Sequence, residues 1–390
     1  MTSVNSGNLA GKSTGGSVSR GRQRIFKLIM FSVMLVIITG TVLVAEYAAR
    51  YREGHRESPP DYFPTVYYPH RRLRYGLTPN VDYYGWFKIN SHGFRGREFS
   101  QKKPPGVFRI VCVGGSTTFD GGSVGKSLPW PEVLESELRR LLGTDTVEVL
   151  NLGIGGATSL DSLIDLQMRG LSFEPDLVIV YQTHNDLIYS IPQPYKEYSS
   201  LYPLEDRPRS SFIRWLTYNS LLYAKSEERV FGALSGAVGA VRKVLALAEP
   251  EPGDDRKESM ERGLAAFRSN VRSIAAIAKA NNLRIVFPEV TIPYPSAATE
   301  PCNQCEALSA NYGHVELSEL VSMFGRYRDA ISKEAQAGGT STFIPTTQFV
   351  PSSDRFYLDP VHYRPDGSRQ FGTMLAQALV ENIKQARANE

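Results

Sequence analysis

The chain has 390 residues and a formal net charge of +4, and 42% of its residues are hydrophobic, which is enough to bury a full core. About 200–250 residues is ordinary for a single α/β domain, so the length allows one such domain with attachments. Basic residues are spread along the chain except at the N-terminus, which argues against a nucleic-acid-binding surface.

The N-terminus predicts a membrane-spanning helix. Residues 1–24 are rich in Gly and Ser and carry basic but no acidic side chains, so we expect a disordered cytoplasmic tail. Residues 25–47 follow as a signal-anchor helix, because the uncharged stretch Leu28–Ala45 would make about 27 Å of helix, near the thickness of a hydrocarbon core. Basic residues before this stretch and mixed charges after it predict a cytoplasmic N-terminus and a periplasmic or extracellular remainder.

A cleaved signal peptide is the alternative for this stretch. Leu43-Val44-Ala45 loosely resembles a small-residue cleavage site. The apolar stretch exceeds a signal core of about 7–15 residues, which favours an uncleaved anchor. A buried soluble helix is disfavoured, because the stretch offers no polar face.

Residues 48–105 are predicted to form an aromatic-rich juxtamembrane segment. Its aromatic side chains suit either a carbohydrate face or packing against the following domain, and packing is favoured. The charged side chains of Lys88, Arg95 and Arg97 are expected at the surface, solvated or ion-paired. The aromatic residues are Tyr62, Phe63, Tyr67, Tyr68, Tyr75, Tyr83, Tyr84, Trp86 and Phe87.

Residues 106–390 are predicted to form one α/β domain, in which apolar strands alternate with helices. This alternation is typical of a doubly wound parallel sheet. An insertion at about 187–257, with a helix near 211–224, interrupts the pattern. The predicted strands are 108–113, 147–152, 176–182, 283–290 and an apolar run at 342–350, and the predicted helices are 128–142, 159–171, 260–281, 315–335 and 367–386.

Four short segments carry the residues suited to chemistry. They are Val113–Thr118, Asn151–Gly156, Thr183–Asp186 and Asp359–His362. Each of the first three lies at the C-terminal end of a predicted strand, where open parallel sheets place their ligands. The fourth lies in a C-terminal loop and supplies a base three residues after a carboxylate.

These segments predict a serine-dependent active site. A serine hydroxyl such as that of Ser116 is a weak nucleophile until a base takes its proton, and His362 oriented by Asp359 can meet that need. The oxyanion that forms on attack requires preorganised donors. The N–H groups of Ser116 and Gly156 and the side-chain amide of Asn185 are suited to this role.

The four segments resemble blocks I, II, III and V of the SGNH (GDSL-type) hydrolase superfamily, in the family's order, over roughly residues 90–380. The lead-in Asn90–Gly96 is similar to one seen before block I in a membrane-anchored subset. The resemblance implies a flavodoxin-like α/β fold and the catalytic roles given above. Gly115 stands where the family name has Asp, and Thr183 stands where block III usually has Gly. We expect these departures to affect substrate preference more than catalysis.

The resemblance implies ester hydrolysis through an acyl-serine intermediate, without a cofactor or metal. An outward-facing, tethered domain makes an acylated glycan or a lipid ester the expected substrate. A glycan O-acyltransferase using the same site and a catalytically silent cell-envelope scaffold are the alternatives.

Other site signatures fail on spacing. A phosphate-binding loop ending at Gly125-Lys126-Ser127 would need Gly where Asp120 stands. A dinucleotide fingerprint starting at Gly153 would need Gly where Thr158 stands. The Gly-x-Ser-x-Gly elbow around Ser116 would need Gly where Thr118 stands.

The remaining histidines and the cysteines are weaker candidates. His184 lies beside Asn185, which makes it a candidate for substrate contact. Cys112 is expected to be a small buried side chain. Cys302 and Cys305 form a Cys-x-x-Cys pair, for which a local disulfide is favoured over zinc binding or redox chemistry. The histidines without a partner at recognisable spacing are His55, His70, His92 and His314.

Overall fold

The computed structural model divides the chain into two compact units, Met1–His55 and Arg56–Glu390. Cys302, Cys305, His314 and most of the predicted insertion lie outside the residues that the structure describes. The described residues are 20–55, 65–70, 72–73, 75–191, 211–226, 229–230, 255–290, 292, 308–309, 312, 315–339, 341–351, 353 and 355–388.

The first unit contains helix α1 (Arg20–Gly54), which includes the whole predicted signal-anchor stretch. From Gly21 to Gly54 the helix is long and apolar enough to cross a membrane. Its apolar side chains, such as Leu35 and Ile37, are exposed, as a lipid environment requires. The prediction of an N-terminal transmembrane helix is therefore confirmed by length and composition, two criteria that a signal sequence also meets.

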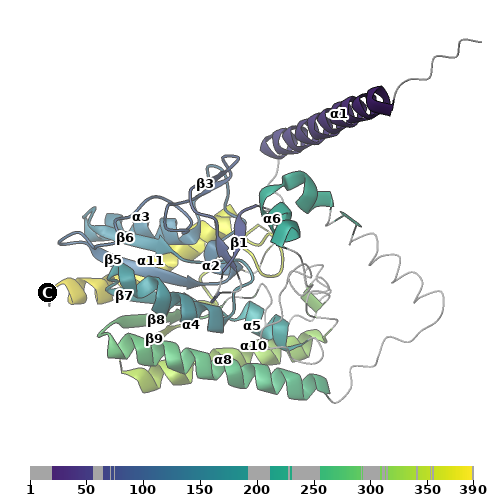
Figure 1. The fold of residues 1–390 in the computed structure, drawn as a ribbon. Helices are drawn as coiled ribbons and strands as arrows, with labels where there is room; N and C mark the ends of the chain where they lie inside the picture. The colour runs from purple at the N-terminus through teal and green to yellow at the C-terminus, as the bar shows by residue number, and fades with distance from the viewer. Residues whose placement is uncertain are drawn as a thin grey trace, which may run out of the picture. The chain divides into compact units, whose positions relative to one another are not determined.

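The second unit is built on a five-stranded parallel sheet with the strand order β6-β5-β7-β8-β9 (Figure 1). Counted in chain order this is 2-1-3-4-5, the order of flavodoxin-like doubly wound folds. The predicted fold class is thus confirmed. The strands are β5 (Phe108–Gly114), β6 (Val147–Asn151), β7 (Leu177–Tyr181), β8 (Arg284–Pro288) and β9 (Ser341–Ile344).

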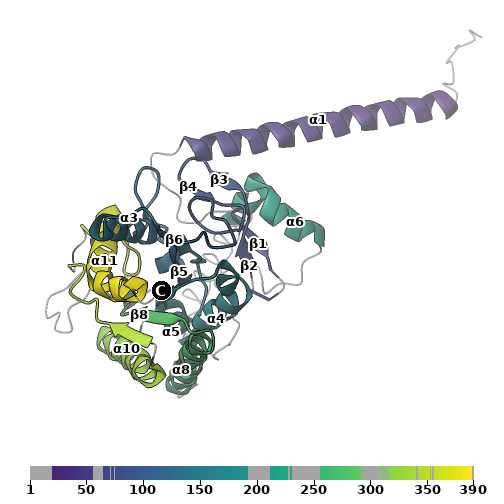
Figure 2. The ribbon, with the colours of Figure 1, turned by 90° about the vertical axis from the view of Figure 1, so that its left-hand side faces the viewer.

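Helices cover both faces of this sheet, as Figure 2 shows. Ile110 and Cys112 of β5 belong to the core on the side of α3 and α11. Val111 and Val113 belong to the core on the side of α4, α8 and α10. Alternate residues of one strand therefore face opposite layers, which explains why β5 is apolar throughout. The helices are α3 (Trp130–Leu142), α4 (Ser159–Met168), α8 (Asp255–Ala280), α10 (Leu317–Gly338) and α11 (Pro365–Ala388).

The aromatic segment before the sheet forms two small antiparallel hairpins. Tyr83 and Phe87 are buried, and their rings stack with centroids 5.4 Å apart. Phe87 also contacts Phe119, which lies just beyond β5, with the ring centroids 5.3 Å apart. These rings therefore pack against α2, the short helix that follows β5. The hairpin strands are β1 (Tyr67–Pro69) with β2 (Tyr75–Leu77), and β3 (Val81–Tyr83) with β4 (Phe87–Ile89).

Short helical elements complete the described part of this unit. Three of them follow strands or helices of the sheet layers, and α6 lies within the predicted insertion. They are α2 (Ser116–Phe119), the 3-10 helix η1 (Gly170–Phe173), α5 (His184–Ser190) and α6 (Ser211–Asn219).

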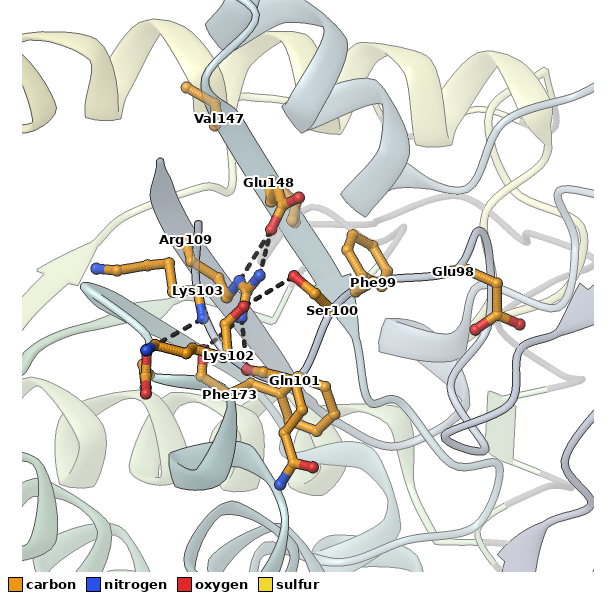
Figure 3. Close-up of polar contacts among 12 residues, drawn as sticks. Glu98, Phe99, Ser100, Gln101, Lys102, Lys103, Arg109, Val147, Glu148 and Phe173 are labelled. Atoms are coloured by element: carbon orange, nitrogen blue, oxygen red, sulfur yellow. Dashed lines mark hydrogen bonds and ion pairs between the residues drawn. The ribbon is translucent and has the colours of Figure 1, made fainter. Parts of the chain in front are cut away.

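A buried ion pair lies toward the N-terminal ends of β5 and β6 (Figure 3). Arg109 is fully buried, and its Nε and Nη2 donate to Oε2 of Glu148, its register partner, at 2.9 and 2.6 Å. Its Nη1 donates to the carbonyls of Gln101 (3.0 Å) and Phe173 (2.7 Å). Removing one partner of a buried ion pair typically costs about 3–5 kcal/mol, because the other charge is left uncompensated. Arg109 therefore contributes to stability at the end of β5 opposite to Ser116.

Candidate active site

Ser116 is the first residue of α2, directly after β5. Thr118 in this helix donates from Oγ1 to the carbonyl of Tyr181 in β7 at 3.0 Å. The indole N–H of Trp130, at the start of α3, donates to the carbonyl of Thr117 at 2.8 Å. These bonds tie the short helix to two neighbouring elements, so the backbone that carries Ser116 is held in place.

Ser116, His362 and Asp359, predicted to act together, are joined by hydrogen bonds. Nδ1 of His362 lies 2.7 Å from Oδ2 of Asp359, and Nε2 lies 2.8 Å from Oγ of Ser116. A carboxylate only accepts hydrogen bonds, so Nδ1 carries the proton of the neutral ring and Nε2 accepts from the serine hydroxyl. The other carboxylate oxygen, Oδ1, accepts from the backbone N–H groups of Val361 (2.7 Å) and His362 (2.8 Å). The chain therefore turns between Asp359 and His362, and this turn fixes the carboxylate relative to the imidazole ring.

The ionisation of His362 and Asp359 is coupled. Burial acts to lower the pKa of His362, but the hydrogen bond and charge of Asp359, with a smaller contribution from Asp120, raise that pKa above its ordinary value of 6.5. Burial acts to raise the pKa of Asp359, but the hydrogen bond and charge of His362 bring that pKa below its ordinary value of 3.8. Asp359 is therefore ionised at neutral pH, and the imidazole is a stronger base than a free histidine.

Gly156 lies in the loop after β6, and Asn185 lies in the first turn of α5, which follows β7. Gly156 adopts a φ of +76°, a conformation that a side chain would strain, and its carbonyl accepts from the hydroxyl of Tyr189 at 3.1 Å. Nδ2 of Asn185 donates to the carbonyl of Ala157 at 2.7 Å, and Nε2 of Gln182 donates to the same carbonyl at 2.9 Å. The amide of Asn185 is thus anchored to the residue that follows Gly156.

Gly115 is packed tightly between these two segments. A Cβ atom added at Gly115 would lie 2.5 Å from Nδ2 of Asn185 and 3.0 Å from the carbonyl oxygen of Ala157. Contacts this short do not occur, so a side chain here would displace the asparagine amide. The departure from the family signature at this position therefore affects the placement of Asn185 as well as the space beside Ser116.

Asp186, next to Asn185, is the centre of a buried polar network. Its carboxylate accepts from the backbone N–H of Ser159 (3.1 and 3.0 Å), from the hydroxyl of Ser159 (2.5 Å) and from Nε2 of Gln182 (3.0 Å). Burial raises the pKa of Asp186 to about 6, although these hydrogen bonds act to lower it. The network joins the N-terminal ends of α4 and α5, which holds the loop of Gly156 next to the turn of α5 that carries Asn185.

His184 is placed differently from the other predicted site residues. It is 3% exposed, and its Nδ1 lies 2.8 Å from the hydroxyl of Tyr312. Its ring also contacts Phe324 of α10, with the centroids 5.2 Å apart. The ring of His184 is therefore packed against buried aromatic side chains.

The other candidates from the sequence are structural in the described regions. Cys112 is a buried free thiol, and burial raises its pKa well above the ordinary value, so it stays protonated. Nδ1 of His70 accepts from the backbone N–H of Leu73 at 3.0 Å, and Nε2 of His92 lies 2.9 Å from the carbonyl oxygen of Phe99. No group of three or more His, Cys, Asp or Glu side chains that could hold a metal ion occurs among the residues described.

The expectation of a surface position was wrong for Arg95. Arg95 is 3% exposed and donates to backbone carbonyls just beyond α2, whereas Arg97 and Lys88 are exposed and ion-paired. The only sequence signal for its burial was its position between Phe94 and Gly96 in the lead-in. Composition alone does not distinguish Arg95 from the basic residues near it. Gln182 was also not predicted as a site residue, although its Nε2 donates to the carbonyl of Ala157 and to the carboxylate of Asp186.

Known proteins resemble this chain at the level of the family. The model of the GDSL-like Lipase/Acylhydrolase family matches residues 112–370, more than half of the chain. No curated protein matches this chain. Solved structures that match include a lipase/acylhydrolase from Enterococcus faecalis, at 15% identity over 71% of this chain and 97% of that chain, with a TM-score of 0.40. A mutant of an acetyl-xylooligosaccharide esterase from Geobacillus matches at 14% identity over 72% and 95% of the two chains, with a TM-score of 0.40.

The matched residues run from the strand before Ser116 to beyond His362, so they include all four segments singled out in the sequence. With this match, the chain belongs to the GDSL-like lipase/acylhydrolase family and is an ester hydrolase.

Proposed function

We propose that the chain hydrolyses a carboxylic ester through an acyl-Ser116 intermediate, with His362 as the general base and Asp359 as its orienting partner. The observation that carries this proposal is the unbroken hydrogen-bond path from Ser116 Oγ through the imidazole to Asp359, with links of 2.8 and 2.7 Å. A base within hydrogen-bond reach of the nucleophile, itself held by a third group, is the arrangement that activates a serine hydroxyl.

In this mechanism Ser116 Oγ attacks the ester carbonyl carbon while its proton passes to Nε2 of His362. The carbonyl oxygen becomes an oxyanion, which the N–H groups of Ser116 and Gly156 and one N–H of the Asn185 amide would stabilise. The other amide N–H of Asn185 is already directed at the carbonyl of Ala157, so the side chain is preorganised for this role. His362 then gives its proton to the leaving alcohol. In the second half His362 takes a proton from water, whose oxygen attacks the acyl carbon; the bond to Ser116 Oγ breaks, the serine takes the proton back, and the carboxylic acid leaves.

The proposed substrate is an acylated glycan or a lipid ester outside the cytoplasm. The support for this is α1, whose length and composition suit a membrane anchor, and the basic N-terminal flank, which favours a cytoplasmic N-terminus. A tethered domain on the outer side would meet lipids of the same membrane and glycans of the envelope. Substrate contact by His184 stays a prediction; the contacts of its ring with Tyr312 and Phe324 support a part in packing α5 against α10.

Replacing the nucleophile should abolish turnover. Ser116→Ala should lower kcat for p-nitrophenyl esters on the order of 10⁴-fold or more without unfolding the chain, because one hydroxyl is removed from a turn held by other residues. His362→Ala should be about as damaging. The measurement is steady-state hydrolysis of acetyl to palmitoyl esters, with and without a sugar acceptor to detect transfer. Turnover by Ser116→Ala at the rate of the unaltered chain would remove this serine from the mechanism.

The rate should rise with pH as His362 loses its proton, because only the neutral imidazole can accept the proton of Ser116. Since the pKa of His362 is raised, the midpoint of the kcat/KM profile should lie above 6.5. In Asp359→Ala the burial of His362 remains but its anionic partner is gone, so the midpoint should move to lower pH. This variant should also lose less activity than Ser116→Ala. A profile that is flat from pH 5 to 8, with chemistry limiting the rate, would contradict a histidine base.

Restoring the family's Asp at position 115 should damage the enzyme. Gly115→Asp and Gly115→Ala should each lower kcat about 10²–10³-fold, the usual cost of losing one oxyanion donor, because the added Cβ displaces the Asn185 amide. Gly325→Ala is the matched control, since nothing lies within 4 Å of a Cβ at that position in α10. If Gly115→Asp kept the kcat of the unaltered chain, Asn185 would not be held as proposed.

The anchor is testable in cells. The chain should stay in the membrane fraction after a carbonate wash, because α1 is long and apolar enough to remain in the bilayer. Protease added from outside the inner membrane should digest the C-terminal domain. A mature chain that begins near Glu46 would establish a cleaved signal peptide instead, and a protected domain would place the active site in the cytosol.

A further inference from the structure

Arg95 links the lead-in segment to the end of the strands that carry the site. It lies six residues beyond β4, and its backbone forms isolated bridges to Ile89 in β4 and to Asn151 at the end of β6. Its backbone N–H donates to the carbonyl of Asn151 at 3.2 Å. The backbone of Arg95 is thus fixed to the C-terminal end of β6, the strand that leads into the loop of Gly156.

The guanidinium group of Arg95 binds the chain just beyond the nucleophile. Nη1 donates to the carbonyls of Phe119 and Asp120, at 2.6 Å each, and Nη2 donates to the carbonyl of Ser123. The group also lies over the rings of Phe119 and Phe87, 4.7 and 5.4 Å from their centroids. A planar group with a fixed fork of donors can span several carbonyls and stack on rings at once, which an ammonium group cannot do.

The three carbonyls belong to the C-terminal end of α2 and to the loop after it. The last carbonyls of a helix have no partner within the helix, and leaving them buried without one is costly. Ser116 and Asp120 are ends of one turn, because the N–H of Asp120 donates to the carbonyl of Ser116 at 2.7 Å. A shift at the end of this turn therefore moves the residue that carries the nucleophile.

We propose that Arg95 is a positioning residue that holds α2 so that Ser116 Oγ stays within hydrogen-bond reach of His362. The kinetic test of this inference rests on the proposed function, whereas its test by amide hydrogen exchange does not. A nucleophile displaced by about 1 Å can cost on the order of 10²-fold in rate while substrate binding is little changed. The expected signature is a fall in kcat with KM nearly constant.

A second buried arginine provides the matched control. Arg109 also donates to two backbone carbonyls, but it lies toward the opposite end of β5 from Ser116. In the full chain in detergent, Arg95→Met should lower kcat for p-nitrophenyl acetate about 10²-fold, and Arg95→Lys should recover part of it. Arg109→Met should lower the unfolding temperature without lowering kcat per folded molecule. If a Met variant does not fold, the comparison is made with Arg95→Lys and Arg109→Lys.

Amide hydrogen exchange supplies a readout that needs no turnover. The backbone N–H groups of Thr118, Phe119 and Asp120 close the turn of α2, so they should exchange faster in Arg95→Met than in Arg109→Met when each is normalised to the amides of β7. An Arg95 variant with unaltered kcat and unaltered exchange at these amides would overturn the proposal, as would equal losses in both arginine variants. If the unaltered chain does not hydrolyse esters at all, the proposed function fails, and the exchange comparison alone decides whether Arg95 holds α2.

Discussion

The hydrogen bond between Ser116 and His362 joins residues 246 positions apart, and the rest of the site depends on what brings them together. β5 pairs with both β6 and β7, so the loops after these three strands meet at one edge of the sheet. The loop that carries His362 arrives by another route. It leads into α11, which packs against α3, and the hydroxyls of Tyr181 and Tyr363 lie 3.1 Å apart beside it. Strand order therefore places the serine and the candidate oxyanion donors, and helix packing places His362, the candidate base.

Two buried arginines act at different ends of the same strand layer. Arg109 neutralises Glu148 and binds carbonyls where β5 begins, far along the strand from the site, so its contribution is to stability. Arg95 binds carbonyls where α2 ends, in the turn that begins at Ser116, the proposed nucleophile. Both groups are buried, and backbone oxygens accept the bonds described for Arg95 and half of those described for Arg109, which is how a protein can bury a guanidinium without a dedicated carboxylate for every donor. Their positions relative to Ser116 separate a stabilising role from a positioning one.

The sequence predicted the strands and helices well because the sheet is buried on both faces. A strand such as Phe108–Gly114 is then continuously apolar and ends abruptly at glycine, which makes both its type and its end readable. The joining of Ser116, His362 and Asp359 was predictable because their residue types carry the chemistry at recognisable spacing. The burial of Arg95 was not predictable, because Lys88 and Arg97 nearby have the same charge. Only the tertiary structure brings the carbonyls at the end of α2 to Arg95 and not to the other two. The close contact of Gly115 with Asn185 was hidden for a similar reason, since it joins loops 70 residues apart in the chain.

The pKa values of Asp359 and Asp186 are shifted in opposite directions, and the difference follows from their partners. Asp359 faces an imidazole that can become cationic, so its pKa is lowered and it remains a charge that would stabilise the imidazolium of the proposed mechanism. Asp186 accepts from neutral donors of Ser159 and Gln182, and burial, with a smaller contribution from the charge of Asp161, raises its pKa to about 6. Hydrogen bonds from neutral groups do not fully replace the water that burial removes, whereas a neighbouring cation can. Asp359 is therefore suited to respond to charge that develops in the reaction, while Asp186, whichever form it takes, serves to hold the loop of Gly156 next to the turn of α5 that carries Asn185.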